Sequence, residues 1–144
     1  MRDIVILGST GSIGVQALEV IEANPNKFRV VGLSAGANNL PRLIEQARKF
    51  NVPIVGTTGE GKVLRDSLAG VEVIDGESAA KQIAAISCDV VLNGITGSIG
   101  LGPTLAALEV GNTVALANKE SLVAGGDLVM AHRSEEHTSE LQSH

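Results

Sequence analysis

The feature that most constrains this chain is a glycine-rich heptad near its start, GSTGSIG at residues 8–14. It follows the apolar run 4–7 and precedes an amphipathic stretch that begins at Ile13. This order predicts a strand, a tight turn and a helix. Such a turn lets a pyrophosphate approach the backbone at the positive end of the helix dipole, so a dinucleotide site is the first hypothesis. The G-x-x-G-x-x-G spacing equally fits a plain connection between a strand and a helix.

Composition narrows the class of protein. A chain of 144 residues is about one domain. Phe28 and Phe50 are its only aromatic residues, so Val, Ile, Leu and Ala must build the core, which suits a parallel sheet buried on both faces. The net charge of -5 and the lack of a basic, aromatic patch exclude nucleic acid as a partner.

The N-terminus and the cysteine content indicate the compartment. Only four apolar residues separate Asp3 from the first glycine, too few for a signal peptide or a membrane span. We therefore expect a cytoplasmic protein without a membrane partner. Cys88 is the only cysteine, so no intrachain disulfide can form, and we expect it to serve as a small buried hydrophobe.

Apolar runs and amphipathic stretches alternate along the chain, which predicts an α/β fold with a doubly wound, Rossmann-like parallel sheet. The first helix is expected to bury Ile13, Ala17, Val20 and Ile21 and to end before residues 24–26. The expected strands are 4–7, 28–33, 53–55, 71–74, 90–93 and 113–117. The other expected helices are 40–50, 62–68, 78–86 and 103–110.

A second heptad, GITGSIG at residues 94–100, repeats the first with one change and also follows an expected strand. Pro103 is best placed at the first position of the next helix, so the glycines of this heptad should not lie at a helix N-terminus. Two interpretations stay open. The segment lines the nicotinamide side of the ligand crevice, or it is a flexible connection.

The loop after the second strand indicates which nucleotide is bound. NAD-binding folds carry a carboxylate there for the ribose 2′-hydroxyl. Residues 32–39 contain none, offer only the neutral Ser34, Asn38 and Asn39, and are followed by Arg42. The pattern predicts NADP(H) rather than NAD(H). Alternatively, the two asparagines simply cap the next helix.

A second motif, Ala117-Asn118-Lys119-Glu120-Ser121, follows the last expected strand. It places an amide, an ammonium and a carboxylate at the ligand crevice, although a solvated helix start would also show such charges. With this motif the chain resembles the NADPH-dependent 1-deoxy-D-xylulose 5-phosphate reductoisomerase family. The resemblance covers residues 1 to about 132 and rests on 8–14, 24–25, 28–31, 103–107 and 116–123.

The resemblance implies roles for individual residues. The NADPH contacts that it implies are Thr10, Gly11, Ser12, Ile13, Gly36, Asn38, Asn118 and Glu120. Lys119 would reach the substrate. One departure is Ala37, where many relatives carry a basic residue; this puts one contact to the 2′-phosphate in doubt and draws attention to Arg42.

The family reaction rearranges a sugar phosphate on a divalent metal (Mg, Mn or Co). Hydride transfer from NADPH then gives 2-C-methyl-D-erythritol 4-phosphate, in the non-mevalonate route to isoprenoids. The protein's part is to hold the nicotinamide against a metal-polarised carbonyl. The resemblance further implies a cytoplasmic homodimer for the complete enzyme.

The last residues depart from the family. Its metal ligands belong to an Asp-Ser-Glu-His segment expected after Met130, but from Arg133 the chain resembles a translated sequencing adapter. We expect an NADPH-binding domain at 1–132 and a solvated, disordered, foreign tail at 133–144. This chain should then hold no catalytic or metal-binding residue and should be inactive. Two alternatives are another NADP oxidoreductase, such as a semialdehyde dehydrogenase, and a non-catalytic NADP-sensing module.

Overall fold

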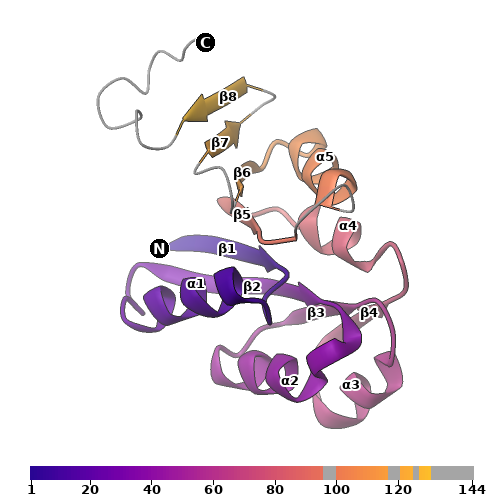
Figure 1. The fold of residues 1–144 in the computed structure, drawn as a ribbon. Coiled ribbons are helices and arrows are strands. Elements are labelled where there is room, and N and C mark those ends of the chain that lie inside the picture. Colours follow the sequence, from indigo (N-terminus) through magenta and orange to yellow (C-terminus); the bar gives the residue numbers. More distant parts are fainter. Residues whose placement is uncertain (96–99, 117–120, 125–126, 131–144) are drawn as a thin grey trace.

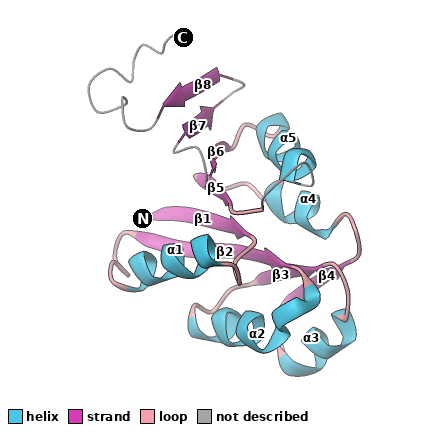
Figure 2. Cartoon of the chain, viewed as in Figure 1, coloured by secondary structure: helices cyan, strands magenta, loops and turns pink. Residues whose placement is uncertain are grey.

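Strands and helices alternate from residue 2 to residue 116, as the sequence predicted (Figures 1 and 2). The computed structural model describes residues 1–95, 100–116, 121–124 and 127–130. The strands are β1 Arg2–Leu7, β2 Phe28–Ala35, β3 Ile54–Thr57, β4 Glu72–Asp75, β5 Val90–Asn93, β6 Thr113–Leu116, β7 Ser121–Ala124 and β8 Asp127–Met130. The helices are α1 Ser12–Glu22, α2 Leu40–Lys49, α3 Gly61–Ser67, α4 Ala79–Ala84 and α5 Leu101–Glu109, with a short 3-10 turn at Ala37–Asn39.

The six predicted strands form one parallel sheet in the order β4-β3-β2-β1-β5-β6. The central strand is apolar because helices cover both faces of the sheet: Val5, Ile6 and Leu7 of β1 are fully buried. The prediction of a doubly wound parallel sheet is confirmed. The predicted domain limit at residue 132 lies outside the described residues.

The helices divide between the two faces of the sheet (Figure 1). Leu18 of α1, Leu43 of α2 and Leu64 of α3 belong to one apolar cluster. Ile83 of α4 and Ala107 of α5 belong to the other. Alternate residues of β1 point into the two clusters, as the period of a strand requires.

The chain changes faces between β1 and β5, which are neighbours in the sheet. It leaves β1 towards α1 on one face and leaves β5 towards α5 on the other. Such a topological switch point opens a crevice at the carboxyl ends of the two strands, where ligands of α/β sheets bind. Each glycine-rich heptad begins directly after one of these strands.

The predicted buried face of α1 is partly wrong. Ile21 is buried, but Ile13 and Val20 are 37% and 58% exposed. The buried face runs instead through Gly14 and Leu18, because the close approach of Gly14 to the preceding turn sets the rotation of the helix.

The predicted start of α5 is also wrong. The helix begins at Leu101, with Gly100 as its N-cap, so the second heptad does lead directly into a helix N-terminus. Pro103 takes the third helical position, which is allowed because the first four N–H groups of a helix have no partner within it.

Strands β7 and β8 were not predicted. They extend the sheet beyond β6 with antiparallel pairing. The sequence SLVA-GG-DLVM carries a signal that could have revealed them, since two apolar runs separated by Gly-Gly are typical of a hairpin.

Candidate dinucleotide-binding site

Two of the three glycines of the first heptad that define its spacing have clear structural reasons. Gly8 has a φ of +75°, a conformation that favours glycine. At Gly14 a Cβ atom would lie 2.5 Å from the Cα of Ser9 and 2.6 Å from the carbonyl oxygens of Gly8 and Ser9. The first turn of α1 therefore packs directly on the backbone of the loop that precedes it.

This packing leaves the N-terminus of α1 open to a ligand. Gly11 is the N-cap and supplies no side-chain hydrogen bond to the first turn. Gly11, Ser12 and Ile13 are exposed, and Thr10 is half-buried. The first N–H groups of a helix lack acceptors within it, so this turn presents donors and a positive dipole end to an anion.

The loop after β2 lies beside the first turn. The carbonyl oxygen of Ser34 accepts the N–H groups of Gly8 and Ser9 at 2.8 and 3.0 Å. Gly36 and Asn38 follow at the end of β2, both exposed. The structure thus brings together the six predicted cofactor residues that it describes, namely Thr10, Gly11, Ser12, Ile13, Gly36 and Asn38.

Capping by the asparagines is confirmed for one of them. The Oδ1 of Asn39 accepts the N–H of Arg42 at 3.2 Å, at the start of α2. Asn38 lies in the 3-10 turn before it. This leaves the side chain of Asn38 exposed at the crevice, where a nucleotide could meet it.

Helix α2 is joined to the first turn by bonds that the sequence did not predict. Ser9 is fully buried, and its hydroxyl donates to the Oε1 of Gln46 at 2.8 Å. The Nε2 of Gln46 donates back to the Ser9 carbonyl oxygen at 2.9 Å. A polar residue on the apolar side of an amphipathic helix was the available signal, because a buried amide must find partners.

A pocket of about 140 Å³ opens next to both loops. It lies at the carboxyl ends of β1, β2, β3 and β5 and is mostly apolar. Its lining residues are Gly8, Ser34, Ala35, Gly36, Thr57, Thr58, Ala79, Ala80 and Ile95. Thr57 and Thr58 were missed by the sequence analysis because no local pattern links them to the glycine turns.

The start of the second heptad touches the first. A Cβ atom on Gly8 would lie 3.1 Å from the carbonyl carbon of Gly94. The buried Asn93 fixes this segment: its Oδ1 accepts the N–H of Ile95 at 2.9 Å, and its Nδ2 donates to the Gly100 carbonyl oxygen at 3.0 Å. The described ends of the heptad therefore border the switch-point crevice.

Two other predicted features are the motif at residues 118–120 and the single cysteine. Asn118, Lys119 and Glu120 lie outside the described residues. Cys88 is half-buried, and burial, followed by the charges of Asp89 and Asp3, raises the pKa of its thiol to about 11. This agrees with a structural thiol.

Two features are absent from the described ranges. These ranges contain no group of three or more His, Cys, Asp or Glu side chains arranged to hold a metal ion. None of the described helices has the length and apolar character that a membrane crossing needs.

Solved reductoisomerase structures resemble this chain. A 1-deoxy-D-xylulose 5-phosphate reductoisomerase from Zymomonas mobilis, solved in complex with NADPH, superposes with a TM-score of 0.76 at 36% identity over 83% of this chain and 32% of its own. A second reductoisomerase, in complex with NADPH, fosmidomycin and magnesium, gives 0.77 at 30% identity over 83% of this chain and 31% of its own.

Sequence comparison gives the same family. The enzyme of Paenarthrobacter aurescens is 53% identical over 92% of this chain and 37% of its own length. The enzyme of Beutenbergia cavernae is 54% identical over 90% of this chain and 34% of its own length. The chain thus spans about a third of the length of these relatives. The family model for 1-deoxy-D-xylulose 5-phosphate reductoisomerase matches residues 4–126. The chain belongs to the 1-deoxy-D-xylulose 5-phosphate reductoisomerase family.

Proposed function

We propose that this chain is the NADPH-binding part of a 1-deoxy-D-xylulose 5-phosphate reductoisomerase. The observation that carries the proposal is the open N-terminus of α1, packed through Gly14 on a tight glycine turn and lying beside a loop without a carboxylate. The presence of NADPH in two solved relatives supports it. The binding domain is proposed to span residues 1–132.

The residues present fit such a cofactor. The N–H groups of Ser12 and Ile13 suit the pyrophosphate, because both residues are exposed and lie in the first turn of α1, at the positive end of the helix dipole. The apolar pocket between Ala35 and Ile95 suits the adenine base. The uncharged loop at Gly36 and Asn38 admits a phosphate on the ribose, since no carboxylate there repels it.

When bound, NADPH supplies the hydride for the reduction step of the proposed reaction. In this chain the residues would bind the nucleotide and direct its nicotinamide towards the crevice between β1 and β5. By the family resemblance, Asn118 and Glu120 are proposed as further cofactor contacts and Lys119 as a substrate contact. The substrate of the complete protein would be 1-deoxy-D-xylulose 5-phosphate and the product 2-C-methyl-D-erythritol 4-phosphate.

A divalent metal is proposed for the complete protein, as magnesium is present in solved relatives. The described residues of this chain do not form a site for it, and we assign them no step that involves a metal. A cytoplasmic location and assembly as a homodimer are likewise proposals for the complete protein.

The test is a titration of the chain with NADPH, followed by nicotinamide fluorescence and by calorimetry. The chain lacks Trp and Tyr, so the signal of the nicotinamide is read without overlap from those residues. We expect saturable binding of NADPH and at least tenfold weaker binding of NADH, the effect of one charge-assisted contact. NADH binding as tight as NADPH binding would refute the assignment of the cofactor.

A further inference from the structure

The end of β2 is where a Rossmann-like fold distinguishes the two nicotinamide cofactors, because the ribose 2′ position lies there. In this chain the loop from Gly36 to Asn39 carries no charged side chain. The loop therefore does not repel a 2′-phosphate, but it also offers that phosphate no positive charge. A positively charged side chain from outside the loop would supply this counter-charge and favour NADPH.

Arg42 lies in the first turn of α2, directly after this loop, and its backbone N–H donates to the Oδ1 of Asn39. Its Nη1 donates to the carbonyl oxygen of Thr10 at 3.3 Å, so its guanidinium lies against the first glycine turn. The side chain is exposed. Among the described residues, Arg42 takes part in none of the four ion pairs. A guanidinium has five N–H donors, and the bond to Thr10 uses one.

The position of Arg42 is fixed by its own helix. Gln46 lies one turn further along α2 and forms the two buried bonds with Ser9 described above. Arg42 and Gln46 thus hold consecutive residues of the first turn, Thr10 and Ser9. Because α2 cannot shift without breaking these bonds, the guanidinium is held beside the turn before any ligand binds.

We propose that Arg42 binds the 2′-phosphate of NADPH and thereby sets the preference for NADPH over NADH. This inference rests on the proposed function, since it needs a nucleotide in the crevice. The planar guanidinium can give a phosphate two parallel hydrogen bonds, which the single ammonium of a lysine cannot. The carbonyl oxygen of Thr10 orients that plane.

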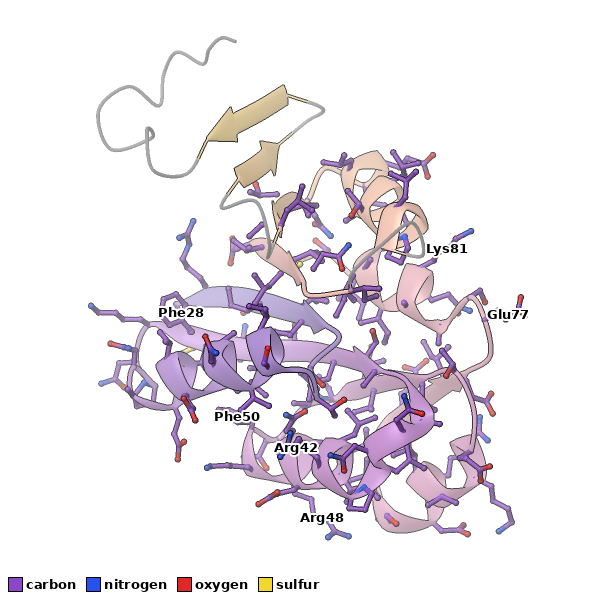
Figure 3. The ribbon with its side chains drawn as sticks, in the orientation of Figure 1. Phe28, Arg42, Arg48, Phe50, Glu77 and Lys81 are labelled. Carbon is purple, nitrogen blue, oxygen red and sulfur yellow. The ribbon has the colours of Figure 1, made fainter. Side chains whose placement is uncertain are left out.

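The test compares R42Q with R48Q in the full 144-residue chain. Arg48 is a matched control: it is exposed, lies on the same helix, and its Nη2 donates to a backbone carbonyl oxygen, that of Ser67, at 2.7 Å. Figure 3 shows Arg42 on the side of α2 towards α1 and Arg48 on the side away from it. Both variants lose one positive charge, but only R42Q loses it at the proposed site.

We expect R42Q to weaken NADPH binding by about 10- to 100-fold, the loss for one charge-assisted pair, and to change NADH binding by less than about threefold. R48Q should change neither. R42K, which keeps the charge and loses the planar fork, should give an intermediate loss. NADPH binding by the parent chain should weaken with added salt more steeply than binding by R42Q. Thermal melts of each variant report whether it is folded.

Equal weakening of NADPH and NADH binding by R42Q would overturn the proposal, because it would mean that Arg42 acts only by holding Thr10. An unchanged preference for NADPH in both R42Q and R42K would also overturn it and leave the proposed function standing. A parent chain that binds neither nucleotide would overturn the proposed function, and this inference with it.

Discussion

Replacing Gly14 with alanine is expected to disturb the first turn more than any other single methyl group there. The added Cβ would lie 2.5 Å from the Cα of Ser9 and 2.6 Å from two carbonyl oxygens, all of them backbone atoms. Carbon atoms pack at about 3.5–4.0 Å, so the turn or the helix must move by roughly 1 Å.

These short contacts set the expected loss in the free energy of unfolding. Overpacking of this kind costs about 1–3 kcal/mol, and the better helix propensity of alanine returns up to about 1 kcal/mol. The net loss of roughly 1–2 kcal/mol should lower the melting temperature by about 3–8 °C for a chain of this size. Displaced N–H groups at α1 should also weaken NADPH binding roughly tenfold or more.

Gly11 is the matched comparison. A Cβ there would lie 3.5 Å from the Gly8 carbonyl oxygen, an ordinary contact, and its φ is -80°. G11A should cost less than about 1 kcal/mol, yet its methyl group would stand at the exposed N-terminus of α1 and weaken NADPH binding. The assays are thermal melts and NADPH titrations of both variants. A G14A chain that melts and binds NADPH like the parent would refute the proposed packing of the turn.

Three further predictions concern the buried pair of Ser9 and Gln46 and the half-buried thiol of Cys88. A double-mutant cycle of S9A and Q46L, read by urea denaturation, should give a coupling of about 1–2 kcal/mol, and a coupling near zero would show that the pair between Ser9 and Gln46 does not stabilise the fold. Because burial raises the pKa of Cys88 to about 11, its thiolate is scarce at pH 8. Allowing for the greater nucleophilicity of a basic thiolate, the folded chain should react with Ellman's reagent about tenfold more slowly than the urea-unfolded chain. The raised pKa also means that the stability tied to the protonated thiol is complete below its ordinary value of 9.0 and is lost as the pH rises towards 11. The melting temperature of the parent should therefore fall more than that of C88A between pH 9.0 and 11. Equal reactivity of the thiol in the folded and the unfolded chain would contradict the assignment of Cys88 as a structural thiol with a raised pKa.

The elements around the first heptad could be predicted because their signals are local. The apolar run 4–7, the glycine at position 8 and the amphipathic stretch that follows are contiguous, and each favours the structure observed. The same holds for Asn39, whose capping role depends on a neighbour three residues away.

The remaining parts of the site depend on contacts between distant residues. Ser9 and Gln46 are 37 positions apart, and only the packing of α2 against the turn brings them together. The contact of Gly8 with Gly94 likewise follows from the pairing of β1 with β5. The start of α5 was missed for a different reason: a preference for proline at the first helical position does not exclude the third.

The central claim is that the turn after β1 and the loop after β2 together hold the nucleotide. The most direct test is a two-dimensional ¹⁵N–¹H NMR titration of the chain with NADPH, with the amide signals assigned. The account predicts that the largest shifts fall on Thr10, Gly11, Ser12, Ile13, Gly36 and Asn38, and that Gly70 and Gly111, which lie in turns elsewhere, stay unchanged. Saturable binding that shifts other amides and leaves the turn of residues 8–14 unaffected would contradict it.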